Sequence, residues 1–125
     1  MAKVLGLGGV FFKTADGAAL REWYARVLGL EISDYGAFFT PDMLADLPGA
    51  GTVFSPFKAS TDHFAPSTMD YMFNLLVDDL DGVLARCIAA GVEPLAPVLD
   101  ESYGRFAQIM DLEGRKIELW QPKAA

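Results

Sequence analysis

Residues 110–120 read Met-Asp-Leu-Glu-Gly-Arg-Lys-Ile-Glu-Leu-Trp, a polar turn that leads into a strand. Gly114 supplies the positive φ that a tight turn after Asp111 requires. Side chains then alternate along residues 116–121, which is typical of a strand with one face on a core. The two faces carry Ile117 and Leu119 on one side, and Lys116, Glu118 and Trp120 on the other. The stretch therefore predicts the closing hairpin of a sheet whose second face borders a cleft or solvent.

Two helix patterns lie upstream of this hairpin. The spacing of apolar residues predicts helices over about 17–28 and 80–90. An Asp can cap the start of each helix, and a Gly can end each in a left-handed turn. The apolar stripes match at an offset of sixty positions: Leu20, Trp23, Tyr24, Val27 and Leu28 in the first helix, and Leu80, Val83, Leu84, Cys87 and Ile88 in the second. The match indicates an internal repeat.

Strand-like segments complete the repeat. One precedes each helix, over residues 4–12 and 71–77, and shorter segments follow each helix, over residues 37–40, 52–56, 105–110 and 116–121. The order strand, helix, strand, strand, strand therefore occurs twice, in modules of about residues 4–57 and 69–122 joined by a linker of about 58–68. A module of about sixty residues is marginal alone, so we expect a single α+β domain.

Composition excludes several classes of protein. The chain has 125 residues, 52% of them apolar, with a net charge of −7 and one Cys. These values predict one folded domain without an internal disulfide, and an acidic chain is a poor partner for nucleic acid. The longest apolar run, residues 4–12, is too short to span a membrane. We expect the cytoplasm as its compartment.

The quoted segments resemble the vicinal oxygen chelate superfamily, which includes glyoxalases, bleomycin-resistance proteins and extradiol dioxygenases. The likeness covers about residues 5–122. It rests on the Trp23-Tyr24 helix with its Val27-Leu28-Gly29-Leu30 ending, on residues 77–81 before the second helix, and above all on the hairpin 110–120. The resemblance implies two βαβββ modules that form an incomplete barrel around a central cavity.

Metal-dependent members of this superfamily hold a divalent cation, and the resemblance identifies the matching positions here. Glu118 matches the carboxylate of the last strand, whereas Gly9 and Met72 stand at the first-strand positions. Glycine has no side chain, and a thioether is a poor ligand for zinc, nickel, iron or manganese. The remaining donors are His63, in the linker, and Asp70. We therefore expect no catalytic metal and no other cofactor.

Several residues are candidates for a ligand site. Glu118 beside Trp120 is either a proton acceptor against an aromatic wall or part of a solvated face. Arg105 either contacts an anionic group of a ligand or is a surface residue. The candidate ligand-binding residues are Met72, Asn74, Arg105, Trp120 and Tyr71.

Three functions follow from this set of residues. The first is a metal-free protein of glyoxalase or bleomycin-resistance type that binds a small amphipathic molecule in the cavity, with a weak preference for cations. The second is a glyoxalase-like lyase or isomerase in which Glu118 acts as base, with Asn74, Tyr71 or Arg105 as the electrophilic group. The third is an interaction module, and in every case we expect a homodimer.

Overall fold

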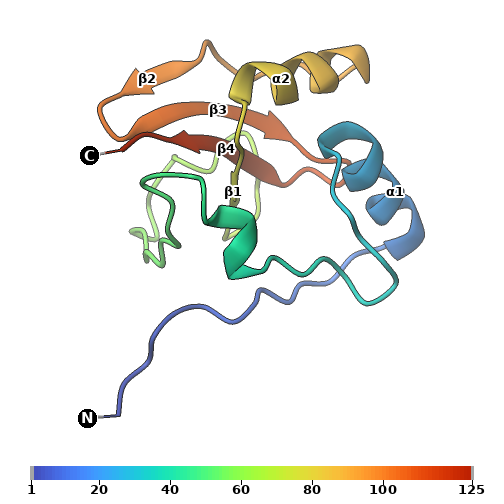
Figure 1. Ribbon diagram of the computed structural model, residues 1–125. Helices are drawn as coiled ribbons and strands as arrows, with labels where there is room; N and C mark the ends of the chain where they lie inside the picture. Colours follow the sequence, from blue (N-terminus) through green and yellow to red (C-terminus); the bar gives the residue numbers. More distant parts are fainter. Residues whose placement is uncertain (1, 125) are drawn as a thin grey trace.

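The computed structural model describes residues 2–124 and has the expected α+β architecture (Figure 1). The sheet has the strand order β1-β4-β3-β2, with β1 parallel to β4 and the other neighbours antiparallel. In chain order, the elements are α1 (Gly17–Leu28), the 3₁₀ helix η1 (Pro41–Leu44), β1 (Phe73–Leu76), α2 (Leu80–Ala89), β2 (Leu99–Glu101), β3 (Gly104–Met110) and β4 (Lys116–Pro122). In the described part of the chain, neither helix combines the length and the apolar character needed to cross a bilayer.

The two helices begin and end as their capping residues predict. Asp16 and Asp79 each accept a hydrogen bond from the backbone N–H three residues further on, at 3.1 Å. Gly29 follows α1 directly with a left-handed φ of 71°, and Gly91 lies two residues beyond the end of α2 with a φ of 85°. The bounds of α1 agree with the prediction, and α2 ends at Ala89, one residue earlier than predicted.

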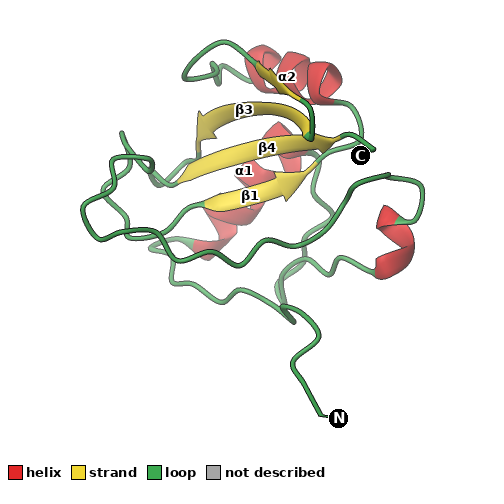
Figure 2. Ribbon diagram, turned by 90° about the vertical axis from the view of Figure 1, so that its left-hand side faces the viewer, coloured by secondary structure: helices red, strands yellow, loops and turns green. Residues whose placement is uncertain are grey.

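The core lies between the two helices and one face of the sheet. Four of its eleven buried apolar residues come from α1, so that helix is part of the same core as the second half of the chain. Ile117 and Leu119 of β4 are completely buried, which confirms the predicted alternation. The full set is Leu20, Trp23, Tyr24, Val27, Leu80, Leu84, Cys87, Ala107, Ile109, Ile117 and Leu119. In Figure 2, α1 lies behind the strands and the opposite face of the sheet is open toward the viewer.

A buried polar network joins the closing hairpin to the first half of the chain. Arg115, with 2% of its surface exposed, contacts the Asp111 carboxylate at 3.3 Å and donates to the Tyr71 hydroxyl at 2.7 Å and the Lys13 carbonyl at 2.6 Å. The Tyr24 hydroxyl of α1 donates to Asp111 at 2.7 Å. Burial, together with this hydrogen bond, raises the pKa of Tyr24 well above its ordinary value. The network therefore connects α1, the entry to β1 and the segment before α1 to one turn.

The strands expected in the first half are not formed. Residues 4–12, 37–40 and 52–56 contain no strand, so the prediction for these three segments is wrong. A strand needs a neighbour to pair with its backbone, and none of these segments is paired in the described chain. The three glycines within residues 4–12 also weaken a strand. This N-terminal segment is instead extended and exposed, and it leads away from the sheet in Figure 1.

Replacing Cys87 with Ser should lower the free energy of unfolding by about 1–3 kcal/mol, because it places a hydroxyl in the apolar core. Cys87 is completely buried on α2, and this burial raises the pKa of its thiol. Urea denaturation measures the change. Ala85→Ser, at an exposed position of the same helix, is the matched control and should have little effect. Equal stability of the two variants would contradict the assignment of Cys87 to the core.

Candidate binding face

Three polar side chains meet on the open face of the sheet, one from each of three adjacent strands. The strand register places Asn74 of β1 and Gln108 of β3 on either side of Glu118 in β4. The Asn74 amide donates to one carboxylate oxygen of Glu118 and the Gln108 amide donates to the other, both at 2.8 Å. We call Asn74, Glu118 and Gln108 the amide–carboxylate row. The two hydrogen bonds fix the orientation of the carboxylate.

Aromatic side chains lie directly beside this row. Trp120 follows Glu118 by two residues on the same face and is paired in register with Phe106 of β3. Their rings are nearly parallel, with centroids 6.0 Å apart, and the Tyr103 ring meets Phe106 edge-on at 5.5 Å. The indole N–H of Trp120 donates to the Tyr103 carbonyl at 3.3 Å. Tyr103, Phe106 and Trp120 form what we call the aromatic row.

Gly104 allows Trp120 to take this position. A Cβ atom at residue 104 would collide with the indole nitrogen and would lie 2.9 Å from the Gln121 carbonyl. The indole ring therefore packs directly on the backbone at Gly104, and any larger residue at this position would displace the ring.

The charge of Glu118 has no cationic counterpart in residues 2–124. The ion pairs of this part of the chain all lie elsewhere, and none includes Glu118. Lys116 precedes Glu118 by two residues in β4, but its ammonium group donates to the His63 carbonyl at 2.7 Å. Within the described residues, the side chains that contact the carboxylate are therefore the two neutral amides.

The structure separates Arg105 and Tyr71 from this face. Arg105 lies two residues from buried Ala107 in β3, on the helix side, and contacts Asp81 of α2 through two hydrogen bonds of 2.9 and 3.2 Å. These bonds lower the pKa of Asp81. The Tyr71 hydroxyl accepts its hydrogen bond from Arg115. Of the predicted residues, the structure thus brings together Asn74, Glu118 and Trp120, while Met72 is half-buried directly before β1.

The residues present do not fit a divalent metal. A catalytic metal takes about three protein ligands, and in residues 2–124 no three His, Cys, Asp or Glu side chains are grouped to hold one. Gly9 lies in the exposed N-terminal segment, and the His63 ring stacks on Phe57 at 5.2 Å. The face around Glu118 therefore offers too few ligands for a catalytic metal.

Gln108, Phe106 and Tyr103 belong to this face but were not among the predicted site residues. The signal was present in the hairpin, because the turn at residues 111–114 fixes which residues of β3 lie opposite those of β4. Counting outward from this turn places Gln108 opposite Glu118 and Phe106 opposite Trp120.

A hollow lies away from this face. It has a volume of about 480 Å³ and is open to solvent between the end of α1 and η1. Its lining residues are Gly29, Leu30, Glu31, Phe38, Phe39 and Met43. No residue of the amide–carboxylate row or the aromatic row lines it, and Glu31 is its one charged side chain, so it lacks the convergent polar groups of a binding site.

Comparison with known proteins gives a family match and two similar structures. A model of the glyoxalase-like domain matches residues 9–120. The crystal structure of TioX from Micromonospora sp. ML1 has a TM-score of 0.52 and 20% sequence identity, over 100% of this chain and 98% of that chain. The crystal structure of UcmS2 has a TM-score of 0.56 and 15% identity, over 95% of this chain and 99% of that chain. These two likenesses concern the fold alone. A comparison with curated protein sequences gives no significant match.

Proposed function

Because the chain belongs to the glyoxalase-like domain family of the vicinal oxygen chelate superfamily, we propose that it binds a small amphipathic molecule on the open face of its sheet. One observation carries the proposal: a carboxylate held by two amides lies beside a row of aromatic rings. Sites for small molecules are mostly apolar and have a few fixed polar groups that orient the ligand. The face around Glu118 has this composition.

Fluorescence of Trp120 tests where the ligand binds. The chain has two Trp residues, and Trp23 is buried in the core, so a ligand on the open face should quench mainly Trp120. Titration with aromatic amphiphiles should therefore quench the wild type and leave the emission of Trp120→Phe nearly unchanged. Equal quenching in the two proteins would place the ligand elsewhere and overturn the proposal.

We propose that this binding requires no catalytic metal, since the side chains around Glu118 do not form a metal site. Elemental analysis of tag-free protein should give far less than one equivalent of zinc, nickel, manganese, iron or copper. Stoichiometric metal that is lost in Glu118→Ala would overturn this part of the proposal. Stoichiometric metal that is kept in that variant would point to other ligands, such as His63 and Asp70.

A glyoxalase-like lyase or isomerase is the second candidate. The observation in its favour is the fixed orientation of Glu118, which suits a base that removes a proton next to a carbonyl. Such a reaction also needs a group that stabilises the enolate. Arg105 is paired with Asp81 and Tyr71 is bound to Arg115. The donors beside Glu118 are the Asn74 and Gln108 amides, which already donate to its carboxylate. We therefore place binding ahead of catalysis.

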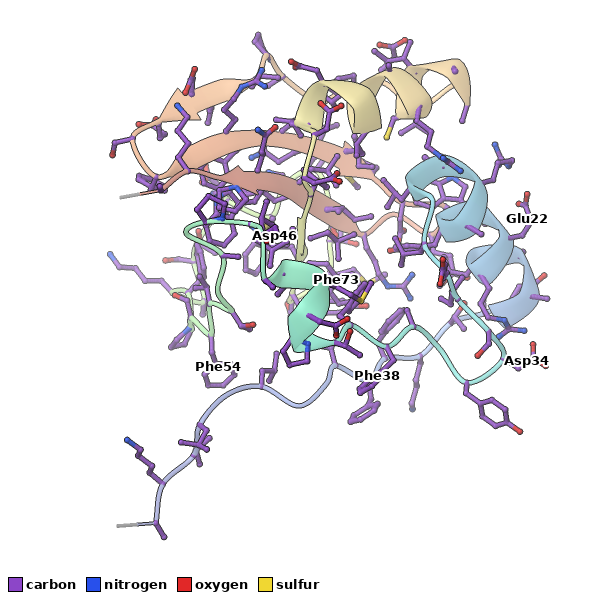
Figure 3. The ribbon with its side chains drawn as sticks, viewed as in Figure 1. Glu22, Asp34, Phe38, Asp46, Phe54 and Phe73 are labelled. Carbon is purple, nitrogen blue, oxygen red and sulfur yellow. The ribbon has the colours of Figure 1, made fainter. Side chains whose placement is uncertain are left out.

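Association with a second copy is a further candidate, favoured by the apolar surface of the first half. Phe11 and Phe54 are 96% and 86% exposed, and Figure 3 shows Phe38 and Phe54 directed away from the sheet. Soluble monomers rarely expose many large apolar side chains together. Sedimentation velocity should therefore give the mass of a dimer. A monomer at all accessible concentrations would contradict this.

A further inference from the structure

No cationic side chain of residues 2–124 forms an ion pair with Glu118. The two amides that hold its carboxylate are neutral, and the ion pairs in the described chain do not reach it. Each carboxylate oxygen has about two acceptor positions, and one hydrogen bond is made to each, so acceptor capacity remains on both oxygens. A ligand that brings N–H donors and a positive charge would complete this site.

The aromatic row provides the second half of the site. Residues two apart on one face of a strand are separated by roughly 7 Å, which sets the spacing from Glu118 to Trp120. The Trp120 and Phe106 rings are both half-buried and nearly parallel, so they keep part of their surface for contact with a ligand. An aromatic face attracts cations and stacks with other rings.

We infer that the ligand is an aromatic organic cation, whose ammonium or amidinium group binds the Glu118 carboxylate while its ring lies on the aromatic row. This inference rests on the proposed function, because it specifies the chemical class of the molecule bound there. The cation and the ring of such a ligand meet the two parts of the face at the same time. The net charge of −7 adds a weak long-range attraction in the same sense.

The alternative ligand classes fit less well. An anion would need an Arg or Lys side chain directed at it, but Arg105 is paired with Asp81 and Lys116 is bound to the His63 carbonyl. A neutral aromatic molecule would contact the aromatic row but would leave the Glu118 charge without a partner. An inorganic divalent cation would need further ligands that are absent from the residues around Glu118.

Three probes that share a naphthalene ring but differ in charge distinguish these ligand classes. They are 1-naphthylmethylammonium, 1-naphthalenemethanol and 1-naphthylacetate, which are cationic, neutral and anionic. Isothermal titration calorimetry at low salt should give about tenfold tighter binding of the cation than of the alcohol, with the anion weakest. Physiological salt should reduce this preference without removing it.

Two variants that remove the same charge test the assignment to Glu118. Glu118→Gln should reduce the preference for the cation to within about twofold. Glu22→Gln removes a carboxylate from the outer side of α1 (Figure 3) and should keep the full preference. Thermal unfolding should give both variants a melting temperature close to that of the wild type.

The outcomes separate the inference from the proposed function. Equal affinities for the three probes, or tighter binding of the anion, would overturn the inference while small-molecule binding still stands. Loss of the cation preference in Glu22→Gln as well as in Glu118→Gln would also overturn it, because overall charge would then explain the effect. No binding of any probe would overturn the proposed function together with the inference.

Discussion

Replacing Arg115 with Met should lower the free energy of unfolding by about 3–5 kcal/mol, which is typical when one partner of a buried ion pair is removed. The guanidinium group contacts the buried Asp111 carboxylate and supplies hydrogen bonds to Tyr71 and to the Lys13 carbonyl. Without it, Asp111 keeps the Tyr24 hydroxyl and two backbone N–H groups but loses its positive partner. Urea denaturation followed by circular dichroism measures the loss.

Two further variants show whether the effect comes from this network. Arg26→Met removes an exposed Arg that pairs with Glu22 within α1, and it should cost less than about 1 kcal/mol. Arg115→Lys keeps the charge but not the planar group that contacts several acceptors, so its stability should lie between those of the wild type and Arg115→Met. A loss in Arg115→Met no larger than that in Arg26→Met would show that the network contributes little.

Leu119→Ala is the second large effect, with an expected loss of about 2–5 kcal/mol. Leu119 is completely buried in β4, in the core to which both helices contribute, and its truncation leaves a cavity that the surrounding side chains can fill only in part. Leu112→Ala makes the same chemical change at a half-exposed position of the hairpin turn, and it should alter stability by less than about 1 kcal/mol. Thermal or urea unfolding of the pair gives the comparison directly.

Leu119→Ala compared with Glu118→Gln also tests the division of β4 into two faces. Leu119 lies between Glu118 and Trp120 in sequence, but its side chain points to the core while theirs lie on the open face. Glu118→Gln should therefore change ligand affinity with little change in stability, and Leu119→Ala should lower stability severely. A Glu118→Gln variant that unfolds as easily as Leu119→Ala would make Glu118 a structural residue.

The sequence was sufficient to predict two kinds of element: helices whose ends depend on nearby residues, and the strand of the closing hairpin, which the adjacent turn positions. The bounds of α1 depend on an N-cap, an apolar stripe and a C-terminal glycine, all of which are local signals. The alternation of side chains along β4 was also sufficient to predict that Ile117 is buried in the core and that Glu118 lies on the opposite, partly exposed face. Residues 4–12 carry an equally apolar pattern, but a strand depends on a neighbouring edge that sequence periodicity cannot specify.

The site was predictable in part for the same reason. Glu118, Trp120 and Asn74 follow from alternation within one strand each. Gln108 required the register between β3 and β4, which the position of the turn determines. Arg105 shares the phase of Ala107 and Ile109 in β3, so alternation alone already indicated the helix side for it.

The contribution of α1 to the core has a consequence for how the polypeptide can be divided. Four core residues of α1 pack under the sheet, and Arg86 of α2 donates to the carbonyls of Ala25 and Arg26 at the end of α1. The first part of the linker, residues 58–63, contains no helix or strand and is mostly exposed. We therefore expect that a proteolytic nick there leaves two fragments that stay associated. We also expect halves produced separately to reconstitute the domain by fragment complementation.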